Sequence, residues 1–329
     1  MDSTDIPRWR GFNLQVKYRT PDLNRGHWID RFREEDFEWI ADWGFDFARV
    51  PMDYRCWIGD DWLDFREDVL AEIDEGVEYG RKHGVHVNLN FHRGPGYTVA
   101  SPPEETDLFT DEKTQEVFVE HWRAFAERYE GVPSEELSFD LLNEPAHTDP
   151  GAYAAVVERT VDAIHEVDPD RLVVADGMDY GKDPVFELAD VDCAQSTRGY
   201  SPGRVSHYQA SWVDSEGWDE PTWPLETDER TWDQDRLREE CIEPWRELEA
   251  EGVGVHVGEW GAYQHTPHDV VLAWMEDFLE LWEEAGWGWA LWNFRGPFGI
   301  LDSGRKDVEY EDWHGHDLDR EMLELLQRY

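Results

Sequence analysis

The chain has 329 residues and a formal net charge of −46, and 14% of its residues are aromatic. This acidic balance excludes nucleic acids as partners, because binding their phosphates requires clustered lysine and arginine. Strongly acidic chains are often disordered, but the aromatic content and the scatter of the acids along the chain favour a folded protein with an acidic surface. Because concentrated salt screens self-repulsion of this size, we expect a protein from a halophilic source.

The cysteines and the N-terminal stretch bear on the compartment. Cys56, Cys193 and Cys241 are odd in number and form no CxxC pair, so we expect neither a disulfide framework nor a cysteine-rich metal site. The N-terminus, MDSTDIPRWRGFNL, lacks a charged start followed by an apolar run, and no window resembles a membrane span. We therefore expect a cytoplasmic enzyme without a membrane partner. A secreted form whose signal had been removed would have the same sequence, and the oligomeric state stays open.

Strands and helices are expected to alternate along the first half of the chain. Apolar residues at Val69, Leu70, Ile73 and Val77, for example, form one stripe at helical spacing. The expected strands cover 10–15, 46–51, 85–91 and 137–142, and the expected helices cover 34–43, 65–82, 113–129 and about 156–167.

The second half continues the same alternation, with one interruption. Expected strands cover 171–175, part of 191–197, 254–261 and 287–294, and expected helices cover 184–189, 237–248, 271–282 and 318–326. The strand within 191–197 has the weakest pattern. The stretch 199–232 is irregular and contains Trp212, Trp218 and Trp223. Loops of this length are usually functional or disordered, and we expect one of these tryptophans to line a cleft.

About eight strand–helix units without a break predict one (β/α)8 TIM barrel that spans residues 1–329 as a single domain. A doubly wound sheet is the alternative. It would carry a glycine-rich phosphate turn after its first strand, and GFNLQVKYRT has no such pattern.

Two of the expected strands end in a glutamate. The run LSFDLLNEP (137–145) places Glu144 where a buried strand leaves the core, and GVHVGEWG (254–261) places Glu259 in the same way. In a barrel, both strand ends meet at one rim. Two carboxyl groups on that rim predict glycoside hydrolysis, with one acid and one nucleophile or base. Taken alone, Glu144 could be a surface residue that caps a loop, and Glu259 could be a structural partner of an arginine. Their positions at strand ends favour catalysis.

Further polar and aromatic residues follow other expected strands. Arg49 could favour the ionised form of Glu259, and Asn143 could bind the sugar 2-hydroxyl. Trp292 could stack under the sugar, and His92 follows the third strand. The structural alternatives are a rim ion pair for Arg49, a core histidine for His92 and core packing for Trp292.

The sequence resembles glycoside hydrolase family 5, the cellulase-like (β/α)8 enzymes. The matching segments are GFDFARVPMDY (44–54), VNLNFHRGPGY (87–97), FDLLNEP (139–145), SHY (206–208), VGEWG (257–261) and WALWNFRGPFGILDS (289–303). The resemblance implies a retaining hydrolase of β-linked glucans that acts on an oligo- or polysaccharide and needs no cofactor or metal. It implies Glu144 as acid/base and Glu259 as nucleophile. The substrate-binding residues that it implies are Arg49, His92, Asn143, His207, Tyr208 and Trp292.

One segment departs from the family pattern. The family commonly has His-x-Tyr near the sixth strand, with the tyrosine close to the nucleophile, whereas this chain has His207-Tyr208-Gln209. Tyr208 is the candidate for that place from a shifted backbone, and the alternative, that it does not fill it, stays open. Three alternatives stay open: a β-mannanase, an exo-acting β-glycosidase and a non-catalytic carbohydrate-binding barrel.

Overall fold

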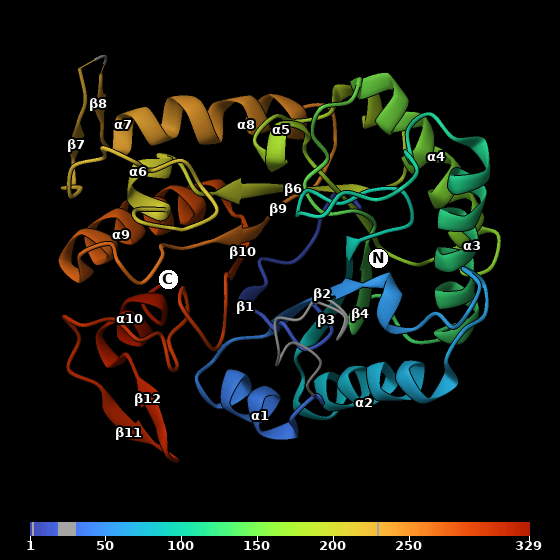
Figure 1. Ribbon diagram of the computed structural model, residues 1–329, viewed down its shortest axis with the longest axis horizontal. Helices are drawn as coiled ribbons and strands as arrows, with labels where there is room; N and C mark the ends of the chain where they lie inside the picture. The colour runs from blue at the N-terminus through green and yellow to red at the C-terminus, as the bar shows by residue number, and fades with distance from the viewer. Residues whose placement is uncertain (2, 19–30, 229) are drawn as a thin grey trace.

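A closed barrel of eight parallel strands forms the centre of the computed structural model, which describes residues 1, 3–18, 31–228 and 230–329 (Figure 1). Each strand pairs with the next along the chain, and the last pairs back with the first. This confirms the predicted (β/α)8 fold. The barrel strands are β1 (Arg10–Asn13), β2 (Phe47–Asp53), β3 (His86–Arg93), β4 (Leu137–Asp140), β5 (Val173–Asp176), β6 (Ala194–Gly199), β9 (Val255–Trp260) and β10 (Gly288–Leu291).

Helices surround the barrel, with α1 and α2 along the bottom of Figure 1, α3 and α4 on the right and α9 on the left. Among the described residues, no helix has the length and apolar composition that crossing a bilayer requires. The α-helices are α1 (Glu34–Asp42), α2 (Glu67–His83), α3 (Glu112–Arg128), α4 (Pro150–His165), α5 (Met178–Gly181), α6 (Gly203–Ser206), α7 (Gln234–Leu237), α8 (Glu243–Glu249), α9 (His268–Ala285) and α10 (Arg320–Leu326). The shorter turns are η2 (Tyr54–Cys56), η3 (Phe186–Leu188) and a π-helical turn, η4 (Arg238–Ile242).

The predicted apolar stripe of α2 is buried against the barrel, which is what an amphipathic helix gains by packing there. Gly80 lies at the tightest contact, where an added Cβ would be 2.3 Å from Val87 Cγ2 on β3. The helix ends at Gly84, whose φ of 71° is left-handed and suits glycine. The apolar stripe predicted from the sequence is therefore the face of α2 that packs on the barrel, and glycines lie at the close contact and at the helix end.

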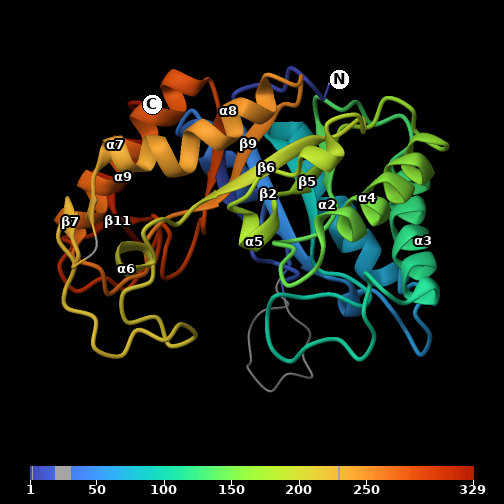
Figure 2. The ribbon, with the colours of Figure 1, turned by 90° about the horizontal axis from the view of Figure 1, so that it is seen from above.

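The parallel strands bring their carboxyl ends to a single rim. Arg49 on β2 is in register with Asn13 on β1 and Asn88 on β3, so polar side chains occupy the barrel near this end. On the opposite side of the barrel, Arg198 on β6 is in register with Glu259 on β9. In Figure 2, α5, α6 and the long loop after β6 lie together on one side of the barrel.

Apart from shifts of a few residues at element ends, the helix predicted over 184–189 is only the 3-10 turn η3, α5 was not predicted, and further differences lie in the second half of the chain. The barrel strand expected within 191–197 is Ala194–Gly199, so it extends beyond the predicted stretch. The stretch 199–232, expected to be irregular, contains α6 and a small hairpin of β7 (Leu225–Glu226) and β8 (Thr231–Trp232). A second hairpin, β11 (Glu311–Trp313) with β12 (His316–Leu318), was not predicted. Strands of two or three largely polar residues are too short to show an alternating apolar pattern, so the sequence does not predict them.

Adaptation to salt stays a prediction, and it can be tested through stability. The chain has 76 acidic and 30 basic residues, so even complete pairing would leave most acids without a cation. Salt weakens local pairs such as Arg128–Glu67, but it also screens the larger excess repulsion. We therefore expect the melting temperature to rise by several degrees between dilute buffer and concentrated KCl. Thermal unfolding followed by circular dichroism measures this, and a melting temperature that fell with KCl would contradict it.

Candidate active site

Glu144 lies in the loop after β4, which ends at Asp140, and neighbouring residues hold its backbone conformation. Its φ is 51°, in the left-handed region that non-glycine residues rarely adopt. The Asp176 carboxylate accepts the Glu144 N–H at 2.9 Å. The Tyr97 hydroxyl donates to the Glu144 carbonyl at 2.7 Å and accepts the Ala146 N–H at 2.8 Å. Residues from β5 and from the loop after β3 therefore fix the direction of the Glu144 side chain.

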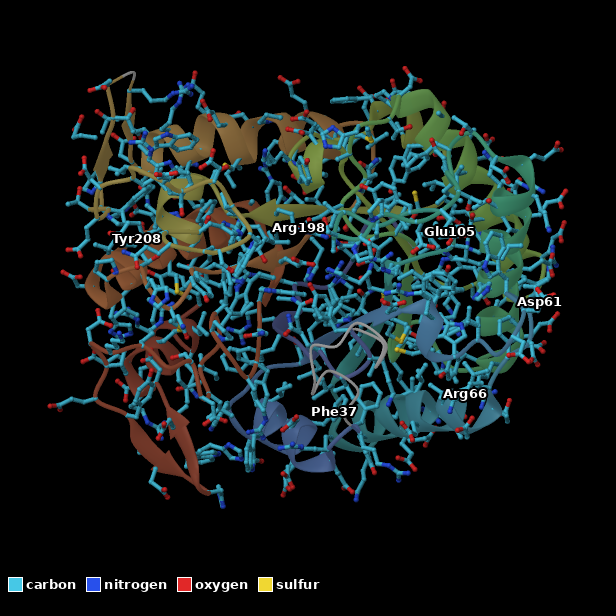
Figure 3. The ribbon with its side chains drawn as sticks, in the orientation of Figure 1. Phe37, Asp61, Arg66, Glu105, Arg198 and Tyr208 are labelled. Atoms are coloured by element: carbon cyan, nitrogen blue, oxygen red, sulfur yellow. The ribbon has the colours of Figure 1, made fainter. Side chains whose placement is uncertain are left out.

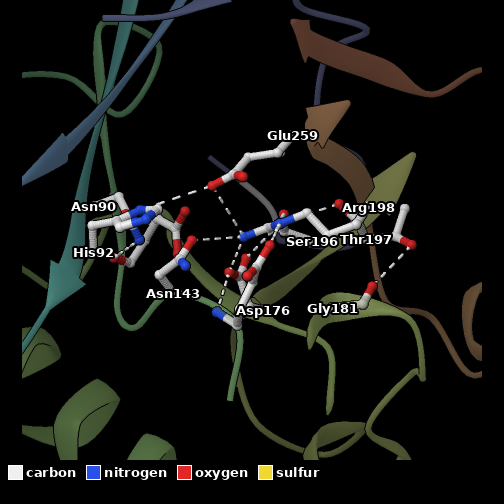
Figure 4. Close-up of polar contacts among 12 residues, drawn as sticks. Asn90, His92, Asn143, Asp176, Gly181, Ser196, Thr197, Arg198 and Glu259 are labelled. Atoms are coloured by element: carbon white, nitrogen blue, oxygen red, sulfur yellow. Dashed lines mark hydrogen bonds and ion pairs between the residues drawn. The ribbon is translucent and has the colours of Figure 1, made fainter. Parts of the chain in front are cut away.

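Glu259 lies on β9, and both of its carboxylate oxygens have partners. Arg49 Nη1 donates to Oε1 at 2.5 Å, and the Tyr200 hydroxyl donates to Oε2 at 3.1 Å. His92 Nδ1 is 3.8 Å from Oε1 (Figure 4). The side chain of Glu259 is almost fully buried. These contacts leave the carboxylate with one defined orientation at the barrel mouth.

Arg198, at the end of β6, connects the two glutamates. Its Nε donates to Glu144 Oε1 at 3.0 Å, and its Nη2 is 3.7 Å from Glu259 Oε1. Arg198 was not among the site residues predicted from the sequence. Figure 3 shows it near the middle of the molecule, and Figure 4 shows its contacts with Glu259 and Asp176. Both glutamates therefore lie within reach of one guanidinium group.

The surroundings of Glu144 favour its protonated form. Burial, followed by the negative charges of Glu259 and Asp176, raises its pKa to about 8, against the opposing effect of Arg198. Burial and the charge of Asp176 likewise raise the pKa of Asp140, to about 7. Glu144 therefore holds a proton at neutral pH beside a second carboxyl group, an arrangement that suits a proton donor.

Asn143 precedes Glu144 and offers a free amide donor. Its Oδ1 accepts hydrogen bonds from Arg49 Nη2 and Arg198 Nη2, each at 3.0 Å. Its Nδ2 is buried, and within the described part of the chain it meets no hydrogen-bond acceptor. A buried donor without an acceptor is costly, so this amide is suited to a ligand hydroxyl.

Three rings form a wall beside Glu259. The His92 and Trp292 rings are stacked, with centroids 5.4 Å apart and an interplanar angle of 16°. Tyr18 contacts both edge-on, with centroid distances of 4.7 Å to His92 and 5.5 Å to Trp292. Trp292 is only half-buried. The predicted residues His92 and Trp292 therefore lie together, and Tyr18 is an unpredicted third member.

The tyrosine prediction requires a correction, because the hydroxyl that meets Glu259 belongs to Tyr200 and not to Tyr208. Tyr208 is buried just after α6, away from Arg198 in Figure 3. His207 supports Tyr200 indirectly: its ring lies edge-on to Tyr200 at 5.1 Å, and its Nδ1 is 2.8 Å from Ser206 Oγ. The stretch Arg198-Gly199-Tyr200 has the spacing of His-x-Tyr with arginine first, and this signal could have located the tyrosine.

Among the loop tryptophans, Trp212 has the surroundings expected of a cleft residue. It is 60% exposed, and its ring lies edge-on to Tyr263 at 4.9 Å and to His207 at 6.1 Å. The other two serve local packing. Trp223 donates its indole N–H to Asp277, and Trp218 lies under the Arg204 guanidinium.

Two histidines outside this site lie beside carboxylates. His316 Nδ1 is 2.7 Å from Asp302, and His268 Nε2 is 2.8 Å from Asp319. Among the residues that the structure describes, no three His, Cys, Asp or Glu side chains gather as a metal site would require. The geometry offers paired carboxyl groups instead.

Comparisons with known proteins agree with this arrangement. A family model described as cellulase, glycosyl hydrolase family 5, matches residues 2–296. Endoglucanase C of Acetivibrio thermocellus is 29% identical and aligns over 88% of this chain and 95% of its own. A crystal structure of a glycoside hydrolase is 40% identical, with a TM-score of 0.92 over 98% of this chain and 99% of that one. Endoglucanase Cel5A of Thermotoga maritima is 25% identical, with a TM-score of 0.79 over 97% and 96%. The chain therefore belongs to the cellulase family, glycosyl hydrolase family 5, and is an O-glycoside hydrolase.

Proposed function

We propose that the enzyme cleaves β-linked glucans with retention of anomeric configuration, with Glu144 as acid/base and Glu259 as nucleophile. One observation carries this proposal: the two carboxyl groups lie at the ends of β4 and β9, close enough for the single guanidinium of Arg198 to reach both. The raised pKa of Glu144 separates the two roles. The endoglucanase names of several relatives support glucan as the substrate.

In the first step, a Glu259 oxygen attacks the anomeric carbon. The bond from that carbon to the leaving oxygen breaks, and its electron pair goes to the leaving oxygen, which takes the proton of Glu144. Arg49 and Tyr200 hold the Glu259 carboxylate for this attack. The products are a glycosyl ester on Glu259, a shortened glucan and an ionised Glu144.

In the second step, water attacks the same carbon from the side that the leaving group vacated. Glu144 takes a proton from the water, and the ester electron pair returns to Glu259. Two inversions at one carbon give net retention. Both carboxyl groups end in their original protonation states, so the cycle consumes only water and needs no other reactant.

The residues around Glu259 are suited to the sugar that is attacked. The free amide of Asn143 is placed to donate to the 2-hydroxyl, a contact that strengthens in the transition state. The half-buried ring of Trp292, backed by His92 and Tyr18, offers an apolar face for stacking. These roles agree with the sequence analysis, except that Tyr200 replaces Tyr208.

Product analysis tests the substrate class. The enzyme would be incubated in concentrated KCl with β-glucan, β-mannan and β-xylan oligosaccharides, with Glu259→Gln as the inactive control. We expect cleavage of the β-glucan series, with the β-anomer formed first when products are followed by NMR. Cleavage of β-mannan alone would reassign the substrate, and release of the α-anomer would refute retention.

The pH profile should reflect the raised pKa of Glu144. A proton donor acts only while protonated, so kcat/KM should fall as the pH rises through about 8, the pKa of Glu144 in the folded protein. Measuring kcat/KM on an oligoglucan from about pH 3 to about pH 10 checks this, because the window includes both the raised and the ordinary pKa of a glutamate. A loss of activity centred near about 4.3, the value of a solvated glutamate, would contradict it.

A further inference from the structure

The two arginines at the barrel mouth contact the glutamates differently. Arg49 reaches Glu259, and its other carboxylate partners among the described residues are Asp140 and Asp176. Arg198 reaches both glutamates, with Nε on Glu144 and Nη2 near Glu259. One rigid, planar group therefore contacts both carboxyl groups through two different nitrogens.

Asp176 holds the Arg198 guanidinium in place. It accepts hydrogen bonds from Nη1 at 3.1 Å and from Nη2, and Ser196 Oγ lies 3.0 Å from Nη1. Both Arg198 and Asp176 are buried, with side-chain exposures of 1% and 0%. Asp176 also accepts the backbone N–H of Glu144, so the arginine and the acid/base share one support.

Two glycines make room for Arg198. A Cβ added at Gly181 would lie 2.6 Å from Arg198 Cγ, and one added at Gly258 would lie 2.9 Å from Arg198 Nη1. Both distances are shorter than real contacts, so a side chain at either position would press against Arg198. Gly258 also lies against Ser196 Oγ, and Gly181 also has a left-handed φ of 75°. Arg198 is thus enclosed on several sides and cannot swing away from the glutamates without a wider rearrangement.

We propose that Arg198 is a positioning residue that provides one fixed positive charge for whichever of the two glutamates is ionised during the cycle. This inference rests on the proposed two-step reaction. Before the first step the negative charge is on Glu259, and in the glycosyl-enzyme Glu259 is a neutral ester while Glu144 is ionised. The negative charge therefore passes from Glu259 to Glu144, both of which contact Arg198, and it returns to Glu259 in the second step. No side chain has to move, so the stabilisation is preorganised.

Removal of this charge should impair the second step more than the first. The second step needs an ionised Glu144. Loss of a cation that donates to its carboxylate raises the pKa of that carboxyl group, typically by about 1–3. Arg198→Gln would be assayed with 2,4-dinitrophenyl β-cellobioside, whose leaving group needs no proton. We expect a retained burst of dinitrophenol and a steady-state rate about 10- to 100-fold lower near neutral pH. The acid limb of the steady-state pH profile should move to higher pH.

Three variants test whether Arg198 acts through its positive charge or only through its structural contacts. Arg198→Lys keeps a positive charge and should recover part of the steady-state rate. The double variant Asp176→Asn/Arg198→Gln avoids a buried Asp176 carboxylate that has lost its Arg198 partner. Because the charge of Asp176 itself raises the pKa of Glu144, the double variant should show the shifted limb to a smaller extent than Arg198→Gln. Arg171→Gln removes a buried arginine that donates to backbone carbonyls, such as that of Leu137 at the start of β4, and should leave the ratio of burst to steady-state rate unchanged.

The outcomes distinguish this inference from the proposed function. Wild type must first form dinitrophenol in a reaction that depends on Glu259. If Arg198→Gln then loses the burst and the steady-state rate equally, and the acid limb of its pH profile does not shift, Arg198 is only structural. If Glu259→Gln matches wild type on this substrate, the proposed reaction itself is wrong, and the inference falls with it.

Discussion

Replacement of Glu259 with glutamine is expected to lower turnover by about 10⁴-fold or more, the scale seen when other enzymes lose a covalent nucleophile. The amide oxygen is a poor nucleophile, and no glycosyl ester can form on it. Rates on an oligoglucan, with the 2,4-dinitrophenyl glycoside as a second substrate, measure the loss. Both substrates should fail, because the attack on the anomeric carbon is common to them.

The Glu259→Gln variant should remain folded. Glutamine has nearly the same shape, and its oxygen can still accept from Arg49, which also keeps Asp140 and Asn143 as partners. Glu104 offers a matched control, since it is a shielded glutamate that pairs with Arg93 and accepts from the Tyr54 hydroxyl. Glu104→Gln should keep its activity. Substantial turnover by Glu259→Gln, or an equal loss in Glu104→Gln, would contradict the nucleophile assignment.

The same variant should change the acidity of Glu144. The charge of Glu259 is the second largest cause, after burial, of the raised pKa of Glu144. Its removal should lower that pKa, and esterification of Glu259 in the glycosyl-enzyme should act in the same direction. A carboxyl-specific infrared titration of Glu259→Gln, compared with Glu259→Gln/Glu144→Gln, would measure the shift. An unchanged pKa would mean that the two carboxyl groups do not interact.

The sequence was informative where a strand ends in a distinctive local pattern. Glu144 and Glu259 follow or close apolar runs, so the parallel barrel brings them to one rim without any knowledge of distant contacts. Arg49, His92 and Trp292 were located in the same way. The helices were predictable because their buried stripes repeat at 3.6 residues.

The contacts around β6 could not be predicted from local pattern. Its sequence, AQSTRG, is largely polar, so no apolar run marks where the strand ends. Arg198 and Tyr200 were missed for that reason, and the tyrosine was assigned to Tyr208. The roles of Tyr97 and Asp176 depend on hydrogen bonds to the Glu144 backbone across 47 and 32 residues of sequence. These hydrogen bonds join segments that meet only in the closed barrel, so local sequence patterns cannot predict them.

Replacement of Glu144 with alanine is expected to have an effect that depends on the leaving group. An oligoglucan has a poor leaving group and needs the proton, so its hydrolysis should fall by about 10²- to 10⁴-fold, the usual contribution of general acid–base catalysis. The 2,4-dinitrophenyl β-cellobioside departs without a proton, so its first step should survive. The second step then lacks its base, and the glycosyl-enzyme should accumulate as a burst followed by slow turnover.

Azide provides the decisive measurement on Glu144→Ala. The small anion fits the space that the carboxylate leaves, and it attacks the glycosyl ester without needing a base. We expect azide to raise the steady-state rate on the dinitrophenyl substrate and to form β-cellobiosyl azide, whose configuration also reports retention. Azide should not accelerate Glu259→Gln, which forms no ester. A Glu144→Ala enzyme with no burst and no response to azide would show that Glu144 is not the acid/base, because loss of that residue alone leaves the nucleophile and its partners Arg49 and Tyr200 in place.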